Sequence, residues 1–545
     1  MSLKHFLATG ALVALCTLSL SACGNHKQAS NGNKLAAKQV LNWSMQNEIA
    51  TLDSVTVGES ESADMINNTT EGLYRIVNNQ PKTGLATSCK GSADGLTYTL
   101  TLRKNAKWSN GEPVTAHDFV YAWRRAVAPK TQALGSYLYS GIKNADDIVA
   151  GKKDPTTLGV QAAGDYKLVV HLDQKMPYFK LLMGDIRFFP QNEKAVEKYG
   201  KRYGTTAATT VYNGPFVAKG WNGSNLKWKL VKNPTYWDKK NVKLDTLNVS
   251  VVQSPSTAYN LYQANKLDFT YLNAEQAKQL ADAPGYRVFR SAQISYVEFN
   301  EVKKEFKNQK VRQALSYAID RKQLSASVFG NNATPLTGLV PKDLMTFKGK
   351  DFSQLAQTKV GTSYNPKLAR KLMAEGLREL NESKLEFTLL ARDNENEKKE
   401  SEFLQSQIEE TLPQVKVSVR NIPLKSVISQ ASKGNFDAQL TGWLADFADP
   451  INFLDIESKT NSTNMGKWDD PEFNRLLTAA KTTDALDKEK RIADLVKASK
   501  VVNNAQPVVP LVQVGEPEIL RPTVHGLVQN TAGIIDDFKS VYITE

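Results

Sequence analysis

The feature that most restricts the fold is a strand–helix–strand pattern between residues 385 and 420. Leu404, Ile408 and Leu412 recur every four residues, which gives one apolar helical face, and Pro413 ends that helix. Alternating apolar residues flank the helix on both sides: Leu385, Phe387 and Leu389 before it, and Val415, Val417 and Val419 after it. Two strands joined through a helix lie parallel in one sheet, so the pattern predicts an α/β domain.

The rest of the chain also shows the alternation of strands and the spacing of helices. It contains no internal sequence repeat. Residues 96–103 alternate as a strand, residues 436–443 form a third apolar run, and helical stripes occur at 311–319 and 487–502. The chain has 545 residues, of which 41% are hydrophobic and 23% charged. That length predicts two to four domains, and the composition excludes a disordered chain or a multi-span membrane protein.

The amino terminus has the pattern of an export signal. Lys4 precedes an apolar stretch over residues 6–20, which is too short for a comfortable membrane span. The stretch ends in Leu20-Ser21-Ala22-Cys23-Gly24, which resembles the bacterial lipobox. The resemblance implies that residues 1–22 are removed and that Cys23 carries a diacylglycerol. An ordinary signal peptide with an incidental cysteine is the alternative.

Residues 23–38 are small and polar and read as a flexible tether behind the lipidated cysteine. Cys16 leaves with the signal, so Cys89 is the one free thiol, and we interpret it as a buried spectator rather than a reactive group. Removal of the signal removes Lys4 and no acidic residue, so the net charge changes from +13 to +12. The basic residues are spread along the chain, which argues against nucleic-acid binding.

Sequence patterns of catalysis or metal binding are absent. The chain has no G-x-S-x-G elbow, no phosphate-binding loop, no H-E-x-x-H and no cysteine pair with zinc spacing. The sequence does not exclude a catalytic pair of carboxylates acting as acid and base, because it contains many carboxylates. We therefore expect a binding protein without cofactor, metal or enzymatic activity.

Four stretches resemble one family, the oligopeptide-binding lipoproteins of peptide ABC importers, which are extracellular solute-binding proteins of family 5. The stretches follow the order of the family and span most of the mature chain. They are Trp108-Ser109-Asn110-Gly111 within 94–125, Asn213-Gly214-Pro215-Phe216 within 213–237, Val311-Arg312-Gln313-Ala314-Leu315 within 311–321, and Gly442-Trp443-Leu444-Ala445-Asp446 within 436–450.

The resemblance implies a periplasmic-binding-protein-like fold of two lobes with an additional third domain. Lobe I would be discontinuous and comprise 39–75, 208–294 and 505–545. The extra domain would cover 76–207, and lobe II 295–504, which contains the strand–helix–strand unit. Ligand would be enclosed when the two lobes close on it.

The resemblance also implies a ligand site in which Asp446 pairs with the α-ammonium group of a peptide. A charge-assisted hydrogen bond of this kind is lost when the amine is blocked. A structural aspartate satisfied by neighbouring amides is the alternative. The remaining matched positions are Gly442, Trp443 and Leu444 beside Asp446, Val57, Gly58, Glu59 and Ser60 on the opposing edge, and Tyr296 and Asn300 along the cleft.

One departure concerns the peptide carboxylate. Relatives place arginines at two positions of lobe II where this chain has Ala431 and Leu440, and Lys425 and Lys433 nearby read as surface lysines. The ligand length therefore stays open.

The expected function is a lipid-anchored, extracytoplasmic receptor at the cell membrane. It would pass oligopeptides to the permease subunits of an ABC importer. The alternatives are a signalling-peptide receptor, a carrier of nickel, haem or an oligosaccharide, an envelope hydrolase, and an adhesin.

Overall fold

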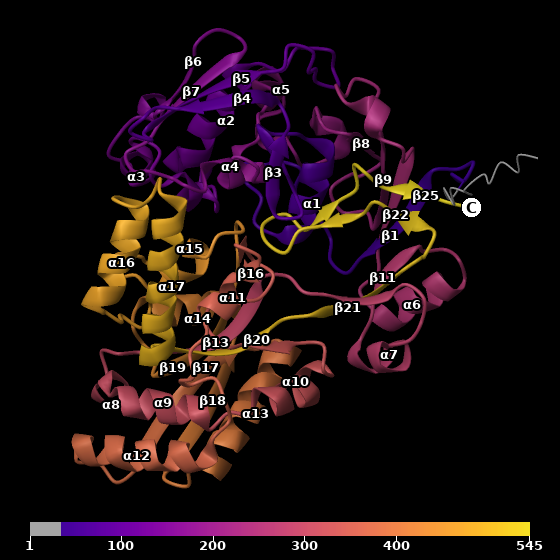
Figure 1. Ribbon diagram of the computed structural model, residues 1–545. Helices are drawn as coiled ribbons and strands as arrows, with labels where there is room; N and C mark the ends of the chain where they lie inside the picture. Colours follow the sequence, from indigo (N-terminus) through magenta and orange to yellow (C-terminus); the bar gives the residue numbers. More distant parts are fainter. Residues whose placement is uncertain (1–33) are drawn as a thin grey trace, which may run out of the picture.

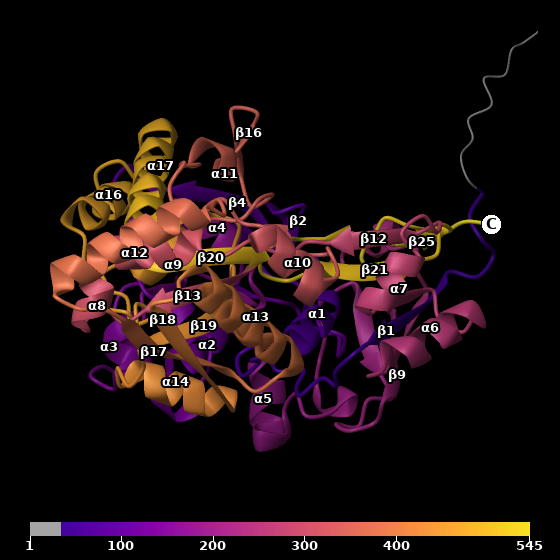
Figure 2. The same cartoon turned by 90° about the horizontal axis from the view of Figure 1, so that it is seen from below.

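The computed structural model describes residues 34–545 and arranges them around three principal sheets (Figure 1). The predicted signal 1–22 and Cys23 lie outside the described residues. Within residues 34–545, every helix is too short or too polar to cross a bilayer. Helices α12 (Pro366–Leu380), α16 (Pro471–Lys481) and α17 (Lys488–Ala505) lie at the end of the molecule opposite the carboxyl terminus (Figure 2).

Lobe I is built on a seven-stranded mixed sheet. Its strands, in spatial order, are β12 (Tyr286–Phe289), β21 (Glu516–Leu520), β11 (Phe269–Tyr271), β1 (Val40–Met45), β10 (Thr246–Val251), β9 (Lys227–Lys232) and β8 (Phe216–Lys219). Helix α1 (Ser60–Thr69) and the carboxyl-terminal segment share a core with one face. In that core Trp43 stacks on Phe269 at 3.6 Å and meets the edge of Phe538.

Lobe II contains a six-stranded sheet. Its strands, in spatial order, are β14 (Thr334–Pro335), β20 (Val508–Gln513), β13 (Gln293–Phe299), β19 (Ala438–Leu444), β17 (Leu385–Arg392) and β18 (Val415–Ile422). Strands β17 and β18 are parallel and joined through α13 (Glu395–Thr411), which confirms the strand–helix–strand unit. Further helices of this lobe are α9 (Gln309–Tyr317), α10 (Arg321–Phe329), α12 (Pro366–Leu380), α14 (Leu424–Ser432), α15 (Ile451–Leu454), α16 (Pro471–Lys481) and α17 (Lys488–Ala505).

The third domain carries a four-stranded antiparallel sheet. Its strands, in spatial order, are β4 (Ala86–Gly91), β5 (Thr97–Leu102), β7 (Lys167–His171) and β6 (Val160–Ala162), and its longest helix is α2 (Ala116–Val127). Strand β5 is the strand expected at 96–103. Cys89 on β4 is half-buried rather than buried, and burial raises the pKa of its thiol, which keeps it protonated and unreactive.

The chain crosses between the lobes twice, after β12 and after β20. The segment 505–545, which we expected wholly in lobe I, is divided between the lobes, because β20 pairs with β13 of lobe II and β21 with β11 of lobe I.

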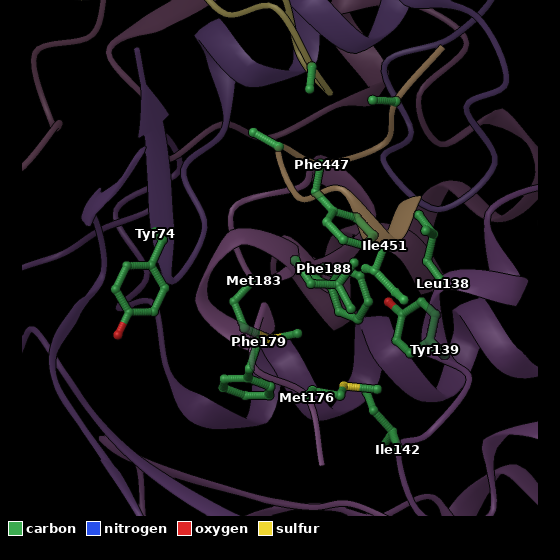
Figure 3. Packing of buried hydrophobic residues seen from close by; sticks show 14 of the residues in the cluster. Tyr74, Leu138, Tyr139, Ile142, Met176, Phe179, Met183, Phe188, Phe447 and Ile451 are labelled. Atoms are coloured by element: carbon green, nitrogen blue, oxygen red, sulfur yellow. The ribbon is translucent and has the colours of Figure 1, made fainter. Parts of the chain in front are cut away.

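Lobe II also packs directly on the third domain. Figure 3 shows Phe447 and Ile451 of lobe II among Leu138, Tyr139 and Phe188 of the third domain. The loop that follows β19 is therefore held between two domains.

Candidate functional site: a carboxylate at a free strand edge

The carboxylate of Asp446 lies just beyond β19, where lobe II meets the third domain. Its Oδ1 atom accepts a hydrogen bond from the Tyr137 hydroxyl of the third domain at 2.8 Å. The Asn452 amide donates to Oδ2 at 3.4 Å, and its oxygen accepts from the backbone of Asp446 and from the indole of Trp443, each at 3.0 Å. Neutral groups alone thus hold this carboxylate.

No cation neutralises Asp446 at ion-pair distance in the described part of the chain. Burial raises the pKa of its carboxyl above the ordinary value, and the nearby Arg187 opposes that rise. The Arg187 guanidinium itself binds Asp185 at 2.9 Å. Three residues beyond Asp446, Asp449 shows the opposite arrangement, with both oxygens bound to Arg491 at 2.8 and 2.9 Å.

Strand β19 has a free edge beside this carboxylate. Strand β13 pairs with β19 along its whole length, from Ala438 to Leu444. On the other side, β17 pairs with Ala438 and Gln439 only. Residues 440–444 therefore face no strand of the described chain on that side. An extended peptide can add to such an edge through its backbone.

The backbone of β19 is oriented to use this edge. The Ala445 amide donates to the Ala292 carbonyl on the β13 side at 3.1 Å. In an antiparallel ladder the backbone groups of successive residues point to alternate sides. The N–H and C=O groups of Gly442 and Leu444 therefore point to the free edge, at the two positions where the family resemblance expects pairing with ligand.

The expected opposing edge, residues 57–60, contacts the segment that carries Tyr137. A Cβ placed on Gly58 would lie 2.4 Å from Cδ1 of Leu134, so Gly58 allows a close approach to the third domain. Leu134 and Tyr137 are 70% and 53% exposed, although both are large and apolar. The two side chains form an open surface between Gly58 and Asp446.

The other residues of this edge differ in their surroundings. Val57 is buried and Ser60 is exposed at the start of α1. The Glu59 carboxylate accepts a hydrogen bond from the Ala50 amide at 2.9 Å, so it is used within lobe I. Backbone groups, rather than the Glu59 side chain, are what this edge offers.

A hollow of about 10 Å³, which is room for about one water molecule, adjoins Asp446 at the junction of all three domains. Its lining includes Gly184 and Asp185 of the third domain, Asp446 and Phe447 of lobe II, and Ala532 and Gly533 of lobe I. The carboxylate of Asp446 therefore lies where the three domains meet.

The structure does not bring Tyr296 and Asn300 to the free edge. Tyr296 is buried in the core of β13. Asn300 is also buried, and its amide donates to the carbonyls of Gly434 and Phe436 at 3.1 and 2.9 Å. Its backbone pairs with Asp437, at the end of β19 far from the anchor. Asn300 thus ties two loops together.

The positions that lack the family arginines are both buried. Ala431 and Leu440 are 3% and 1% exposed, whereas Lys425 and Lys433 are exposed, as expected for surface lysines. Residues 34–545 also contain no cluster of three side chains suited to a metal ion.

Sequence reasoning missed Tyr137, Asn452 and Arg187. Tyr137 and Arg187 come from the third domain, in a region without a matching motif, and they reach Asp446 only through domain packing. Asn452 follows Asp446 by six residues, and its double contact with Trp443 and Asp446 depends on the turn before α15. Gly135 leaves room for the Arg187 stem, since a Cβ there would lie 2.2 Å from Cδ of Arg187.

Two lobes joined by two crossings, with a free strand edge and a carboxylate without an ion-pair partner between the domains, have the architecture of a ligand-binding protein. The family described as bacterial extracellular solute-binding proteins, family 5 Middle, matches residues 80–464. The chain belongs to this family.

Three relatives cover nearly the whole chain. A dipeptide-binding protein of Lactococcus lactis subsp. cremoris (strain MG1363) is 34% identical over 560 residues, with both chains covered completely. The structure of Listeria monocytogenes OppA bound to peptide has a TM-score of 0.76 at 35% identity and covers 94% of this chain and 100% of its own. The structure of the pheromone receptor PrgZ has a TM-score of 0.77 at 34% identity, covering 93% and 100%.

These likenesses confirm the expected family and the mixed α/β fold of several domains. A solute-binding family also agrees with the expectation of a binding protein rather than an enzyme, outside the cytoplasm.

Proposed function

We propose that this chain captures oligopeptides between its two lobes and delivers them to the permease subunits of an ABC importer. The observation that carries the proposal is the unpaired carboxylate of Asp446 at the end of the free β19 edge. The ammonium group of a peptide would supply the cation that this carboxylate lacks. The peptide backbone can pair with Gly442 and Leu444. Peptide binding by the relatives supports the same ligand class.

The binding mode recognises features that all peptides share. The ammonium group meets Asp446 beside the Tyr137 hydroxyl, and the ligand strand continues along residues 440–444 toward residues 57–60 on the other side. Because Ala431 and Leu440 are buried and uncharged, the ligand carboxylate is not fixed at those positions. Peptide length is then set by other groups or left open.

Calorimetry with a free-amine pentapeptide and its N-acetylated form tests this function. Asp446→Asn should weaken binding of the free-amine peptide by about 2 kcal/mol, because a charge-assisted bond is lost. The same substitution should leave the weaker binding of the acetylated peptide unchanged. Asp469→Asn, at a carboxylate paired with Lys459 on the surface, is the matched control and should bind as the parent does. Equal affinity of Asp446→Asn and the parent for the free-amine peptide would refute the anchor.

We also propose that Cys23 carries the lipid that holds the protein at the cell membrane. The support is the lipobox pattern at residues 20–24 and the polar segment that follows it. Two or three acyl chains suffice for stable anchoring. Metabolic labelling with palmitate should mark the parent and not Cys23→Ala, and the variant should move to the soluble fraction. Membrane retention of an unlabelled Cys23→Ala chain would contradict the anchor.

A signalling peptide is the second candidate ligand, favoured by the likeness to a pheromone receptor. A nutritional receptor should bind many pentapeptides within about tenfold in affinity, whereas a signalling receptor should select one sequence. Native mass spectrometry of the purified protein separates both from carriers of nickel, haem or oligosaccharide, because it identifies the copurified ligand by mass.

A further inference from the structure

The sheet of lobe I has an open face over β8, β9 and β10. Trp228 and Leu230 of β9 point into the core, so Lys227 and Lys229 point to the other side. Lys219 of β8 lies directly opposite Lys229 and shares this side. Helix α6 (Pro255–Gln263) packs on β11, which leaves the face over β8–β10 uncovered. We call this region the basic face and define it by Lys219, Lys227 and Lys229.

The segment that carries the basic face has an unbalanced charge. Residues 214–251 contain seven lysines and two aspartates. The lysines are Lys219, Lys227, Lys229, Lys232, Lys239, Lys240 and Lys243, and the aspartates are Asp238 and Asp245. None of these seven lysines forms an ion pair with a described carboxylate, and Asp238 is bound by Lys539 at 2.8 Å. Like charges directly opposite each other on neighbouring strands destabilise a sheet, and neither Lys219 nor Lys229 has a carboxylate partner among the described residues.

A hollow of about 550 Å³ opens at the β8 edge of the basic face. Its cationic lining consists of Lys219 and Lys232, and Ser109, Thr210 and Thr235 add hydroxyl groups. Ammonium and hydroxyl groups are donors that suit phosphate oxygens. The face therefore combines a flat cationic surface with a recess for an anionic head group.

The chain enters the fold beside Lys243, which belongs to the same segment as the strands of the basic face. Lys34 pairs with Glu545 at 2.8 Å, and Leu35 bridges to Thr544. Lys243 lies over the ring of Tyr542, 4.3 Å from its centre, in the same region. Lys34 lies eleven positions after Cys23, with ten residues between them. Their fully extended reach is at most about 40 Å, so an anchor at Cys23 keeps lobe I close to the bilayer.

We propose that the basic face is a membrane-docking surface that adsorbs to the head groups of anionic phospholipids. The closeness to the bilayer rests on the anchor in the proposed function, whereas the adsorption itself does not. Each lysine near an anionic bilayer raises affinity by about fivefold, and salt screens the effect. Docking through lobe I fixes the orientation of this lobe and leaves lobe II free to close on ligand.

Vesicle sedimentation with the unlipidated chain from residue 24, which contains every described element, tests the docking. We expect binding to vesicles of two parts phosphatidylcholine and one part phosphatidylglycerol, little binding to phosphatidylcholine alone, and loss of binding in high salt. The variant K219Q/K227Q/K229Q should bind the anionic vesicles at least about tenfold more weakly. K322Q/K367Q/K398Q is the matched control, since these exposed lysines of lobe II also stand outside ion pairs in the described structure.

Three results would overturn the docking surface. The first is equal binding to neutral and anionic vesicles, and the second is an equal loss of affinity in both triple variants. The third is binding of soluble polyphosphate without binding of anionic vesicles, which would assign the face to a polymer. Peptide affinity is measured on the same samples and should not change. A loss of peptide binding with intact vesicle binding would count against the proposed function alone.

Discussion

Asp446 and Asp449 lie three residues apart in one loop and have opposite surroundings. Asp449 is 5% exposed, as is Arg491, and the two side chains form a bidentate ion pair. Asp446 is half-buried and is held by the hydroxyl of Tyr137 and the amide of Asn452. The protein supplies a cation for Asp449 and none at ion-pair distance for Asp446 in the described part of the chain. This difference is the basis for the proposal that Asp446 serves a ligand.

The largest expected effect is the loss of stability when the ion pair between Asp449 and Arg491 is broken. Asp449→Ala leaves the Arg491 guanidinium buried without its partner, which should lower the free energy of unfolding by about 3–5 kcal/mol. Asp446→Ala should lower it by less than about 1 kcal/mol, because no buried cation is stranded. Urea denaturation of both variants measures the difference, and equal losses would remove the distinction between the two aspartates.

Glu400 differs from both aspartates, because its carboxyl group is buried within lobe II and has no ion-pair partner among the described residues. It lies on α13, 3% exposed, and accepts a hydrogen bond from the Ser295 hydroxyl at 2.6 Å. Burial raises its pKa to about 7. The pKa of Glu400 is higher in the folded state than in the unfolded state. At a pH between these two values, the folded state therefore holds a proton that the unfolded state has released. Stability from this group is therefore complete in acid and is lost as pH rises through about 7.

The second prediction follows from that sign. Glu400→Gln should raise the free energy of unfolding by about 2 kcal/mol near pH 8, because the amide removes the cost of burying a charge. Near pH 4 the variant and the parent should be equally stable. Glu395→Gln is the control on the same helix, where an 80% exposed carboxylate pairs with Lys399, and it should change stability by less than about 0.5 kcal/mol at either pH. A Glu400→Gln effect that does not depend on pH would show that this carboxyl is not protonated in the folded state.

Local periodicity was enough to predict the strand–helix–strand unit of lobe II. The alternation at 385–389 and 415–419 and the four-residue repeat at 404–412 each depend on neighbouring residues, and they became β17, β18 and α13. The assignment of 505–545 to one lobe failed because all six residues of β20 are buried, so their sequence reads the same in either sheet. Which sheet accepts such a strand depends on partners about 200 residues away, such as Val297 opposite Val509.

The residues of the candidate site also fall into two groups, those that the local sequence could predict and those that it could not. Asp446, Gly442 and Leu444 lie in a motif within one strand and its turn, so the sequence could point to them. Tyr137 is 309 positions from Asp446 and contacts it only because the third domain packs on lobe II. Asn300 directly follows β13, the strand next to β19, at the end far from Asp446, a distinction that only the register reveals. Contacts between domains are not encoded in any local pattern.

The smallest expected effect concerns the neutral partner that sequence reasoning missed. Tyr137→Phe removes the hydroxyl that donates to Asp446 and should weaken binding of a free-amine peptide by about 1 kcal/mol, with unchanged stability since the side chain is 53% exposed. Tyr364→Phe, at a 46% exposed tyrosine of lobe II, is the matched control. Combined with Asp446→Asn, Tyr137→Phe should cost less than it does alone, because the hydroxyl acts through the carboxylate. Fully additive losses in calorimetry would mean that Tyr137 contacts the ligand independently, and Asp446 would then meet the ammonium group without help from the third domain.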